Sequence, residues 1–247
     1  MKSLIARLFS LAAANFRPFI VGGSDVSIED FPYQIALLYG GYRNCGGSII
    51  SPNHIVTAAH CVAPARPDEL SIRAGSSSSS SGGTVVNVSS IAMHPQYYAP
   101  TVDNDIAVLT LAESLTYGPG IAPVGLPLSG SALLSTGENV VVSGWGSIRE
   151  AGPSSRILQA VTVSVVSMEE CKESYRDYGD ITDSMFCAGV PEGGKDACGG
   201  DSGGPVVADG VLIGVVSWGH GCARKGFPGV YSSTAFLRDF IAQMTGI

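Results

Sequence analysis

Most of the chain is a succession of short stretches in which apolar, often β-branched residues alternate with polar ones or form brief runs. Turn-forming residues such as Gly, Pro, Asn and Ser separate these stretches. Alternation with a period of two, bounded by turns, is typical of β-strands. Strands are therefore predicted in two successive sets, the first at 34–38, 55–57, 70–74, 85–91 and 107–111, the second at 139–143, 159–166, 205–207, 211–218 and 229–232.

Only the carboxyl-terminal segment has helical spacing. Thr234 stands where an N-cap residue would precede a helix. The apolar residues that follow lie on one helical face, and they are Phe236, Leu237, Phe240, Ile241 and Met244. We expect a closing helix that packs this face against the strands.

Length and composition indicate a folded protein with a large core. The chain has 247 residues, of which 45% are hydrophobic and 14% charged, which is enough for one or two compact units. No stretch approaches the roughly 20 uninterrupted apolar residues of a membrane-spanning helix. We therefore expect a soluble mature protein without a membrane partner.

The amino-terminal segment has the features of a secretion signal. Lys2 and Arg7 accompany a short apolar stretch at 8–14, which ends in three alanines that resemble a small-residue cleavage site. This predicts a signal peptide at 1–14, a short propeptide at 15–19 and a secreted, extracellular protein. Because the apolar stretch is at the lower limit of length, a different start of the chain stays open as the alternative.

The charge balance argues against a polyanionic partner. Without residues 1–19 the chain keeps 11 basic and 21 acidic residues, a formal net charge of about −10. Such a surface disfavours nucleic acid and anionic lipid, and it mildly attracts cationic peptides. Solubility alone is the simpler explanation of the charge.

The candidate chemistry is concentrated in the glycine-rich segment 195–205, which contains Ser202. A serine hydroxyl attacks a carbonyl only when a base removes its proton and hydrogen-bond donors hold the oxyanion. His60 follows an apolar run and is the candidate base. Asp105 directly precedes a second apolar run and is the candidate carboxylate partner of the histidine. Asp103, two positions earlier, is interpreted as a solvated loop acid.

The order of these residues along the chain is His, Asp, Ser, which differs from the orders Asp-His-Ser and Ser-Asp-His of other hydrolases. Three further motifs accompany them: Ile-Val-Gly-Gly at 20–23, Gly-Trp-Gly at 144–146 and Ser-Trp-Gly at 217–219. With these motifs the chain resembles the chymotrypsin-type serine proteases, and among them the trypsin-like ones. The resemblance covers residues 20–247.

The resemblance implies an all-β fold of two six-stranded Greek-key barrels with the active site in the cleft between them and a C-terminal helix. The two halves would span about 20–130 and 131–247. The protease domain as a whole would span 20–247.

The resemblance also implies a role for each motif residue. His60 would be the general base and then the general acid, Asp105 would orient it, and Ser202 would be the nucleophile of an acyl-enzyme route. Ser217 would support Asp105 by a hydrogen bond. The backbone N–H groups of Gly200 and Ser202 would form the oxyanion hole.

Activation is implied by the same resemblance. A newly freed amino terminus at Ile20 would insert and pair with Asp201, because a buried carboxylate needs a cation. Trypsin-type precursors usually carry Lys or Arg before this cut, whereas Phe19 precedes it here. We expect a zymogen that is activated by a different protease, one that accepts Phe.

Asp196 matches the acid at the base of the trypsin pocket, which implies cleavage after Arg and Lys. The residues implied to form the rest of the pocket are Ser217, Trp218, Gly219 and Gly229. Ala197 replaces the serine of many trypsins. Without that hydroxyl to solvate a compact ammonium, Arg is predicted to be preferred over Lys, because guanidinium binds a carboxylate in a bidentate manner.

The six cysteines allow about 15 disulfide pairings, and the lack of Cys-x-x-Cys spacing argues against a metal site. The resemblance implies the pairs Cys45–Cys61, Cys171–Cys187 and Cys198–Cys222. Residues 74–88 hold no Asp or Glu, so we expect no calcium in the loop that binds it in many trypsins, and no other metal or cofactor. Three disulfides without calcium are similar to microbial and fungal trypsins.

The expected function is that of a secreted serine endopeptidase acting on proteins or peptides with Arg or Lys, as a monomer and subject to protein protease inhibitors. The alternative is a catalytically inactive homologue that acts as a binding protein, since a fold does not establish activity. Loss of the His, Asp or Ser would mark such a protein, and all three are present.

Overall fold

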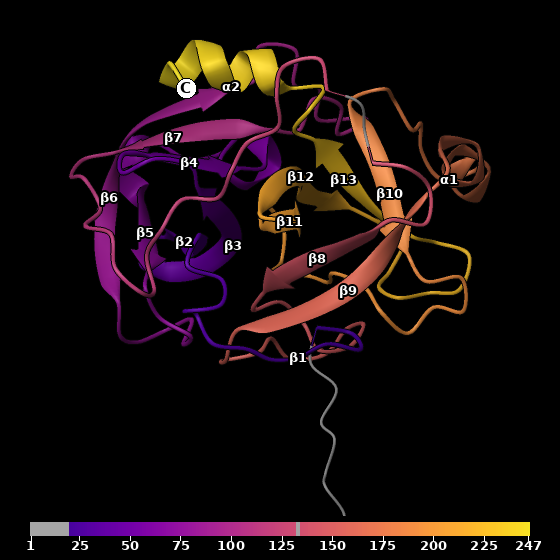
Figure 1. Cartoon of the computed structure of the whole chain (residues 1–247), viewed down its shortest axis with the longest axis horizontal. Helices are drawn as coiled ribbons and strands as arrows, with labels where there is room; N and C mark the ends of the chain where they lie inside the picture. The colour runs from indigo at the N-terminus through magenta and orange to yellow at the C-terminus, as the bar shows by residue number, and fades with distance from the viewer. Residues whose placement is uncertain (1–19, 132–133) are drawn as a thin grey trace, which may run out of the picture.

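The structure is a computed structural model, and it describes residues 20–131 and 134–247. The predicted signal peptide at 1–14 and propeptide at 15–19 lie outside the described residues. Figure 1 shows two sheet-built halves, the first drawn in indigo to magenta and the second in orange to yellow.

The first half is a closed antiparallel barrel with the strand order β2-β3-β4-β7-β6-β5. Every neighbouring pair is hydrogen-bonded, including β2 with β5, which closes the barrel. Its strands are β2 (Gln34–Tyr39), β3 (Tyr42–Ile49), β4 (His54–Thr57), β5 (Leu70–Ala74), β6 (Thr84–Met93) and β7 (Ala107–Leu111).

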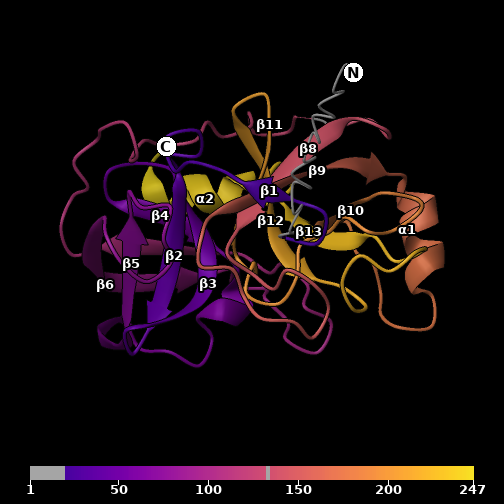
Figure 2. The ribbon, with the colours of Figure 1, turned by 90° about the horizontal axis from the view of Figure 1, so that it is seen from below.

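The second half closes in the same way, in the order β9-β10-β13-β12-β11-β8, with β8 pairing back to β9. A short outer strand, β1 (Ser24–Asp25), is added to β9. The barrel strands are β8 (Asn139–Gly144), β9 (Gln159–Val166), β10 (Met185–Gly189), β11 (Pro205–Ala208), β12 (Val211–Trp218) and β13 (Gly229–Ser233). The two six-stranded barrels confirm the predicted fold class, and Figure 2 shows them side by side from a second direction.

The period-two pattern places apolar side chains inside each barrel. In β5, Leu70, Ile72 and Ala74 are buried while the residues between them are half-buried. In β6, Val86 and Val88 are buried and the intervening residue is exposed. Burying a side chain of this kind contributes roughly 1.5–3 kcal/mol relative to exposure, so the alternation selects the strand and its orientation together.

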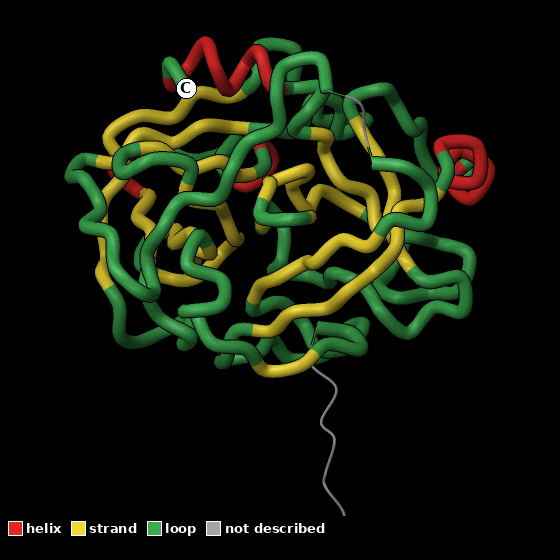
Figure 3. Tube along the Cα trace, viewed as in Figure 1, coloured by secondary structure: helices red, strands yellow, loops and turns green. Residues whose placement is uncertain are grey.

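Two α-helices, α1 (Met168–Tyr175) and α2 (Arg238–Thr245), accompany the barrels in the described residues, and Figure 3 draws helices in red. The closing helix α2 (Arg238–Thr245) returns the chain to the first barrel, where Phe240 and Ile241 join the core that contains Ile72. Neither helix of the described ranges is long and apolar enough to cross a membrane.

The predicted closing helix was too long at its start. Thr234 does not cap it, since its hydroxyl donates to the carbonyl oxygen of Leu212 and the helix begins only at Arg238. Phe236 therefore lies outside the helix, 56% exposed, and Met244 is 37% exposed. Contacts with the second barrel override the helical spacing at this point.

The sequence pattern did not predict the short strand β1, the two 3-10 turns, or three longer elements, β3, β10 and α1. β3 and β10 are rich in Gly, Cys and other small residues, which interrupt the alternation. α1 (Met168–Tyr175) has few apolar residues, and it begins where Ser167 Oγ accepts a hydrogen bond from the N–H of Glu170 at 3.1 Å. Small residues in β3 have a packing reason, because a Cβ at Gly46 would lie 2.9 Å from Gly204 Cα of the second barrel.

The structure contains three disulfides, and they are the pairs that the family resemblance implied. Cys45–Cys61 ties β3 to the 3-10 turn η1 (Ala59–Cys61). A second 3-10 turn, η2 (Pro67–Glu69), precedes β5. The other two pairs join α1 to β10 and one loop of the second barrel to another, and they are Cys171–Cys187 and Cys198–Cys222.

Candidate active site

His60 lies in η1, immediately after β4 of the first barrel. The turn is fixed on one side by the Cys45–Cys61 disulfide and on the other by the N–H of His60, which donates to Asp105 Oδ1 at 2.9 Å. The imidazole side chain is 30% exposed. It is therefore anchored through its backbone while one edge stays accessible.

Asp105 precedes β7 and is fully buried. Its Oδ2 lies 2.7 Å from His60 Nδ1 and accepts a hydrogen bond from Ser217 Oγ at 2.6 Å. An ionised carboxylate can only accept, so Nδ1 must carry the proton and Nε2 keeps its lone pair. This pair fixes the tautomer that a general base requires.

Ser202 lies in the loop between β10 and β11 of the second barrel and is half-buried. Its carbonyl oxygen accepts from the N–H of Gly46 at 2.8 Å, which holds the loop against β3. Across the described ranges, however, no hydrogen bond joins the Ser202 hydroxyl to the imidazole of His60. The structure thus brings His60 and Asp105 into direct contact and places Ser202 on the facing barrel without that contact.

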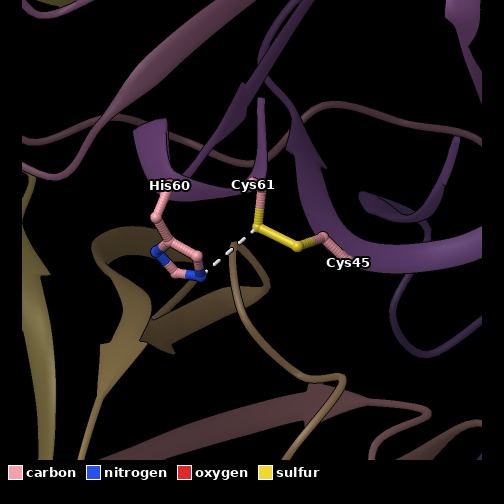
Figure 4. Close-up of side chains that lie close together, drawn as sticks. All are labelled: Cys45, His60 and Cys61. Carbon is pink, nitrogen blue, oxygen red and sulfur yellow. Dashed lines mark hydrogen bonds between the residues drawn. A yellow bond between two sulfur atoms is a disulfide. The ribbon is translucent and has the colours of Figure 1, made fainter. Parts of the chain in front are cut away.

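His60 Nε2 instead lies 3.7 Å from Cys61 Sγ (Figure 4). Ligand atoms of Cys45, His60 and Cys61 all fall within 4.8 Å of one another, as in a metal site. Both sulfurs are bonded to each other, and a disulfide sulfur is not the thiolate that metals bind. The cluster therefore serves to hold the histidine turn.

Two backbone N–H groups of the Ser202 loop make no hydrogen bond among the described residues. The N–H groups of Gly200 and Ser202 donate no hydrogen bond within the part of the chain that the structure describes. Gly200 has φ of +94°, which a residue with a side chain rarely adopts. The guanidinium of Arg43 in β3 donates to the Gly200 carbonyl at 2.8 Å and fixes this peptide. Nothing in the sequence pattern pointed to Arg43.

Asp201, which lies between Gly200 and Ser202 in the sequence, is fully buried. Its carboxylate accepts from the N–H of Gly146 at 2.7 Å and of Cys198 at 3.0 Å. Burial raises the pKa of Asp201 to about 6, although these hydrogen bonds and the nearby Arg43 work in the opposite direction. A carboxylate with this pKa lacks a cation strong enough to offset its burial.

Ile20 is fully buried in the core of the second barrel, in the cluster that includes Val142, Ala188 and Ala197. The next residue is paired with the pocket loop, since Val21 O accepts from the N–H of Asp196 at 3.1 Å. The start of the domain is thus packed against the loop that carries both Asp196 and Ser202.

A cavity of about 370 Å³ opens beside Ser202. Ala197, Ser217, Trp218, Gly219 and Gly229, all expected to form the pocket, line it together with Asp196. Gly229 is required there, because a Cβ would lie 2.6 Å from Asp196 Oδ1.

Asp196 lies at the buried end of this cavity, only 5% exposed. Oδ2 accepts from the N–H of Ala223 at 2.9 Å, whereas Oδ1 makes no hydrogen bond of standard geometry among the described residues, although the buried Tyr231 hydroxyl lies near enough to lower the pKa of the carboxyl. Burial raises the pKa of Asp196 to about 7, against the opposing effect of the backbone hydrogen bonds. One buried oxygen is therefore left for a ligand that donates hydrogen bonds and carries positive charge.

Two closed six-stranded barrels with a histidine–aspartate pair on one and a serine in a glycine-rich loop on the other are the arrangement of chymotrypsin-type serine proteases. The Trypsin family model matches residues 20–241. The chain belongs to the trypsin family, and it is a trypsin-like serine endopeptidase.

Similar proteins include Trypsin alpha of Drosophila melanogaster, 48% identical over 225 residues that cover 90% of this chain and 86% of the relative. Trypsin 5G1 of Aedes aegypti is 44% identical over 229 residues, 92% of this chain and 85% of the relative. Vitellin-degrading protease of Bombyx mori is 41% identical over 222 residues, 90% and 84% of the two chains. These relatives are insect proteins, whereas the disulfide number had suggested a likeness to microbial and fungal ones.

Proposed function

We propose that the protein is a secreted endopeptidase that cleaves after Arg and Lys. The observation that carries this proposal is the buried, partnerless Oδ1 of Asp196 at the end of a 370 Å³ cavity beside Ser202. A long side chain ending in a cation would fill the cavity and supply the missing donor. Because such a cation also offsets the burial of the carboxylate, it is favoured over an apolar side chain.

In the proposed mechanism, His60 Nε2 takes the proton of Ser202 as Oγ bonds to the scissile carbonyl carbon. The C–N bond then breaks while Nε2 returns the proton to the leaving amine, and water repeats the sequence on the resulting ester. Asp105 stabilises the imidazolium in both steps. The Ser202–His60 hydrogen bond would form when substrate closes the site, as catalytic contacts commonly do.

The oxyanion of each tetrahedral intermediate would be held by the free N–H groups of Gly200 and Ser202. Their lack of other partners supports this role, since preorganised donors need not break a bond when charge develops. Removal of one such donor typically costs about 100- to 1000-fold in kcat.

We further propose that the protein is made as a zymogen that is activated by cleavage between Phe19 and Ile20. The buried position of Ile20 and the raised pKa of Asp201 support an ion pair between the new amino terminus and this carboxylate. The residue before the cut is Phe, so the activating protease would differ from a trypsin. Three disulfides fit an extracellular protein. We expect a monomer that protein protease inhibitors can block.

The test is hydrolysis of matched peptide amides ending in Arg, Lys, Phe or Ala, by the mature form beginning at Ile20 and by its Ser202→Ala variant. Cleavage of the Arg and Lys amides that is lost in the variant is expected. Preferred cleavage of the Phe or Ala amide would contradict the pocket assignment. Equal hydrolysis by both forms would contradict the assignment of Ser202 as the nucleophile. If neither form hydrolyses any of the amides, the alternative of a catalytically inactive binding protein is favoured.

A further inference from the structure

Asp103 joins the two barrels beside the candidate site. Its Oδ1 accepts hydrogen bonds from Thr182 Oγ1 and from Ser184 Oγ, each at 2.6 Å. Asp103 belongs to the loop of the first barrel that leads into β7, whereas both hydroxyls belong to the segment before β10 of the second barrel. Asp103 is therefore a half-buried loop acid that is hydrogen-bonded to the second barrel and not only to water.

These hydrogen bonds are of the strong kind. A hydroxyl bonded to a carboxylate lies at about 2.5–2.7 Å when the acceptor is ionised, and such bonds are about twice as strong as neutral ones. Ser184 is 2% exposed, and its Oγ lies 3.0 Å from Thr182 Oγ1. The Asp103 carboxylate and the hydroxyls of Thr182 and Ser184 thus form a small hydrogen-bonded network between the barrels. Ser184 shields it from water on one side.

The backbone around Asp103 is held in a costly conformation. Val102 and Asn104, on either side of it, have φ of +54° and +52°. Left-handed conformations cost of order 1 kcal/mol or more for residues with a side chain, and they persist where surrounding contacts impose them. Asp103 Oδ1 also accepts from the N–H of Asn104 at 2.9 Å, so the same atom holds the turn and the neighbouring barrel.

Asp105 follows two residues later, and its position depends on this turn. Its carboxylate must meet the imidazole, the N–H of His60 and Ser217 at once, at 2.7, 2.9 and 2.6 Å. The second barrel also holds its backbone, because Ser232 Oγ donates to Asp105 O at 2.9 Å. A turn that relaxed toward ordinary φ values would move this carboxylate relative to the second barrel, which carries Ser202.

We propose that Asp103 is a positioning residue for the reaction: through Thr182 and Ser184 it sets the place of Asp105, and hence of His60, relative to the second barrel. This inference rests on the proposed function of His60, Asp105 and Ser202. It concerns how accurately the barrels are aligned, and Asp103 itself touches no reacting atom.

The test compares Asp103→Ala, Asp103→Asn and the double variant Thr182→Val/Ser184→Ala with the unmodified mature enzyme. Ser167→Ala is the matched control, since it removes a hydroxyl hydrogen bond at the start of α1 in which Asp103, Thr182 and Ser184 take no part. Rates are divided by the concentration of active sites from burst titration. kcat, KM and the apparent pKa of kcat/KM are measured with one Arg amide.

Asp103→Ala and the double variant are expected to lower kcat by about 10- to 100-fold with KM changed less than about threefold, because a misplacement of about 1 Å can cost 100-fold in rate. The apparent pKa of the catalytic base should fall, since Asp105 would stabilise the imidazolium less well. Asp103→Asn keeps an acceptor oxygen and should recover most of kcat. Ser167→Ala should change stability alone.

A normal kcat and base pKa in the double variant would overturn the proposal, even where thermal stability falls. If Asp103→Ala does not fold, the double variant decides, because it leaves the first barrel unaltered. The two proposals fail in different ways. A Ser202→Ala enzyme that stays active contradicts the proposed function, whereas an unaffected Asp103→Ala enzyme beside an inactive Ser202→Ala enzyme contradicts only this inference.

Discussion

Selectivity for a basic residue should depend on pH in a way that the burial of Asp196 determines. Burial raises the pKa of Asp196 to about 7 in the free protein. Above that pH the carboxylate is charged and attracts Arg, and below it the acid is neutral and the attraction is lost. The sign is therefore fixed: preference for Arg must fall as the pH is lowered through 7.

The size of the effect follows from the fraction of ionised acid. With a pKa of about 7, Asp196 is about 90% ionised at pH 8 and about 3% ionised at pH 5.5, roughly a thirtyfold difference. The quantity to measure is the ratio of kcat/KM for an Arg amide to that for the matched Phe amide. Titration of the catalytic base affects both substrates equally and cancels in the ratio, and kcat/KM reports groups of the free enzyme.

The ratio is expected to drop about thirtyfold from pH 8 to pH 5.5, in line with a pKa of about 7. In an Asp196→Asn variant, the ratio should be low and flat across the same range, because no charge is left to titrate. A wild-type ratio that stays constant down to about pH 5.5, or a variant that keeps the wild-type profile, would show that Asp196 does not govern the preference for Arg.

Three further predictions concern the pocket, activation and stability. Ala197→Ser should raise kcat/KM for Lys relative to Arg by about 2- to 10-fold, the net value of one ordinary hydrogen bond, measured with matched amides; an unchanged ratio would contradict it. A trace of active enzyme should cleave a Phe19→Arg precursor before Ile20 and leave the natural precursor uncleaved, which amino-terminal sequencing would show. Equal cleavage of both precursors would count against a separate activating protease. Replacing Cys45 and Cys61 by Ala opens a loop of 16 residues. The free energy of unfolding, measured by urea titration, should fall by about 3 kcal/mol, and kcat should fall as well. An unaltered midpoint of the urea transition would show that other contacts hold the turn.

The sequence predicts the barrels because each strand faces an apolar interior and a polar exterior. β9 and β12 have the predicted limits, since β9 alternates apolar and polar residues over most of its length and β12 is a nearly continuous apolar run. β3 escapes prediction because Gly46 must leave room for the second barrel, while Gly47 must leave room for Ile35 and Ile55 of the first. That requirement arises only in the folded molecule, where β3 lies against the Ser202 loop.

The candidate site likewise contains residues that a local motif predicts and residues that only long-range contacts reveal. His60, Asp105, Ser202 and Asp196 stand in short motifs whose residue types carry their chemistry. Arg43 and Asp103 act by hydrogen bonds to residues about 80 or more positions away, so nothing near them in the sequence reveals their partners. A local pattern cannot distinguish an acid that faces water from one that faces two hydroxyls on another barrel.

The central claim is that the hydroxyl of Ser202 becomes acylated by substrates with a basic residue, and rapid-quench mass spectrometry tests it directly. The mature enzyme is mixed with an Arg ester whose acyl group is hydrolysed slowly, quenched in acid and digested for peptide mapping. One acyl group is expected on the peptide that contains Ser202, and none on the Ser202→Ala variant. Acylation of any other residue, or an equal yield in that variant, would contradict it.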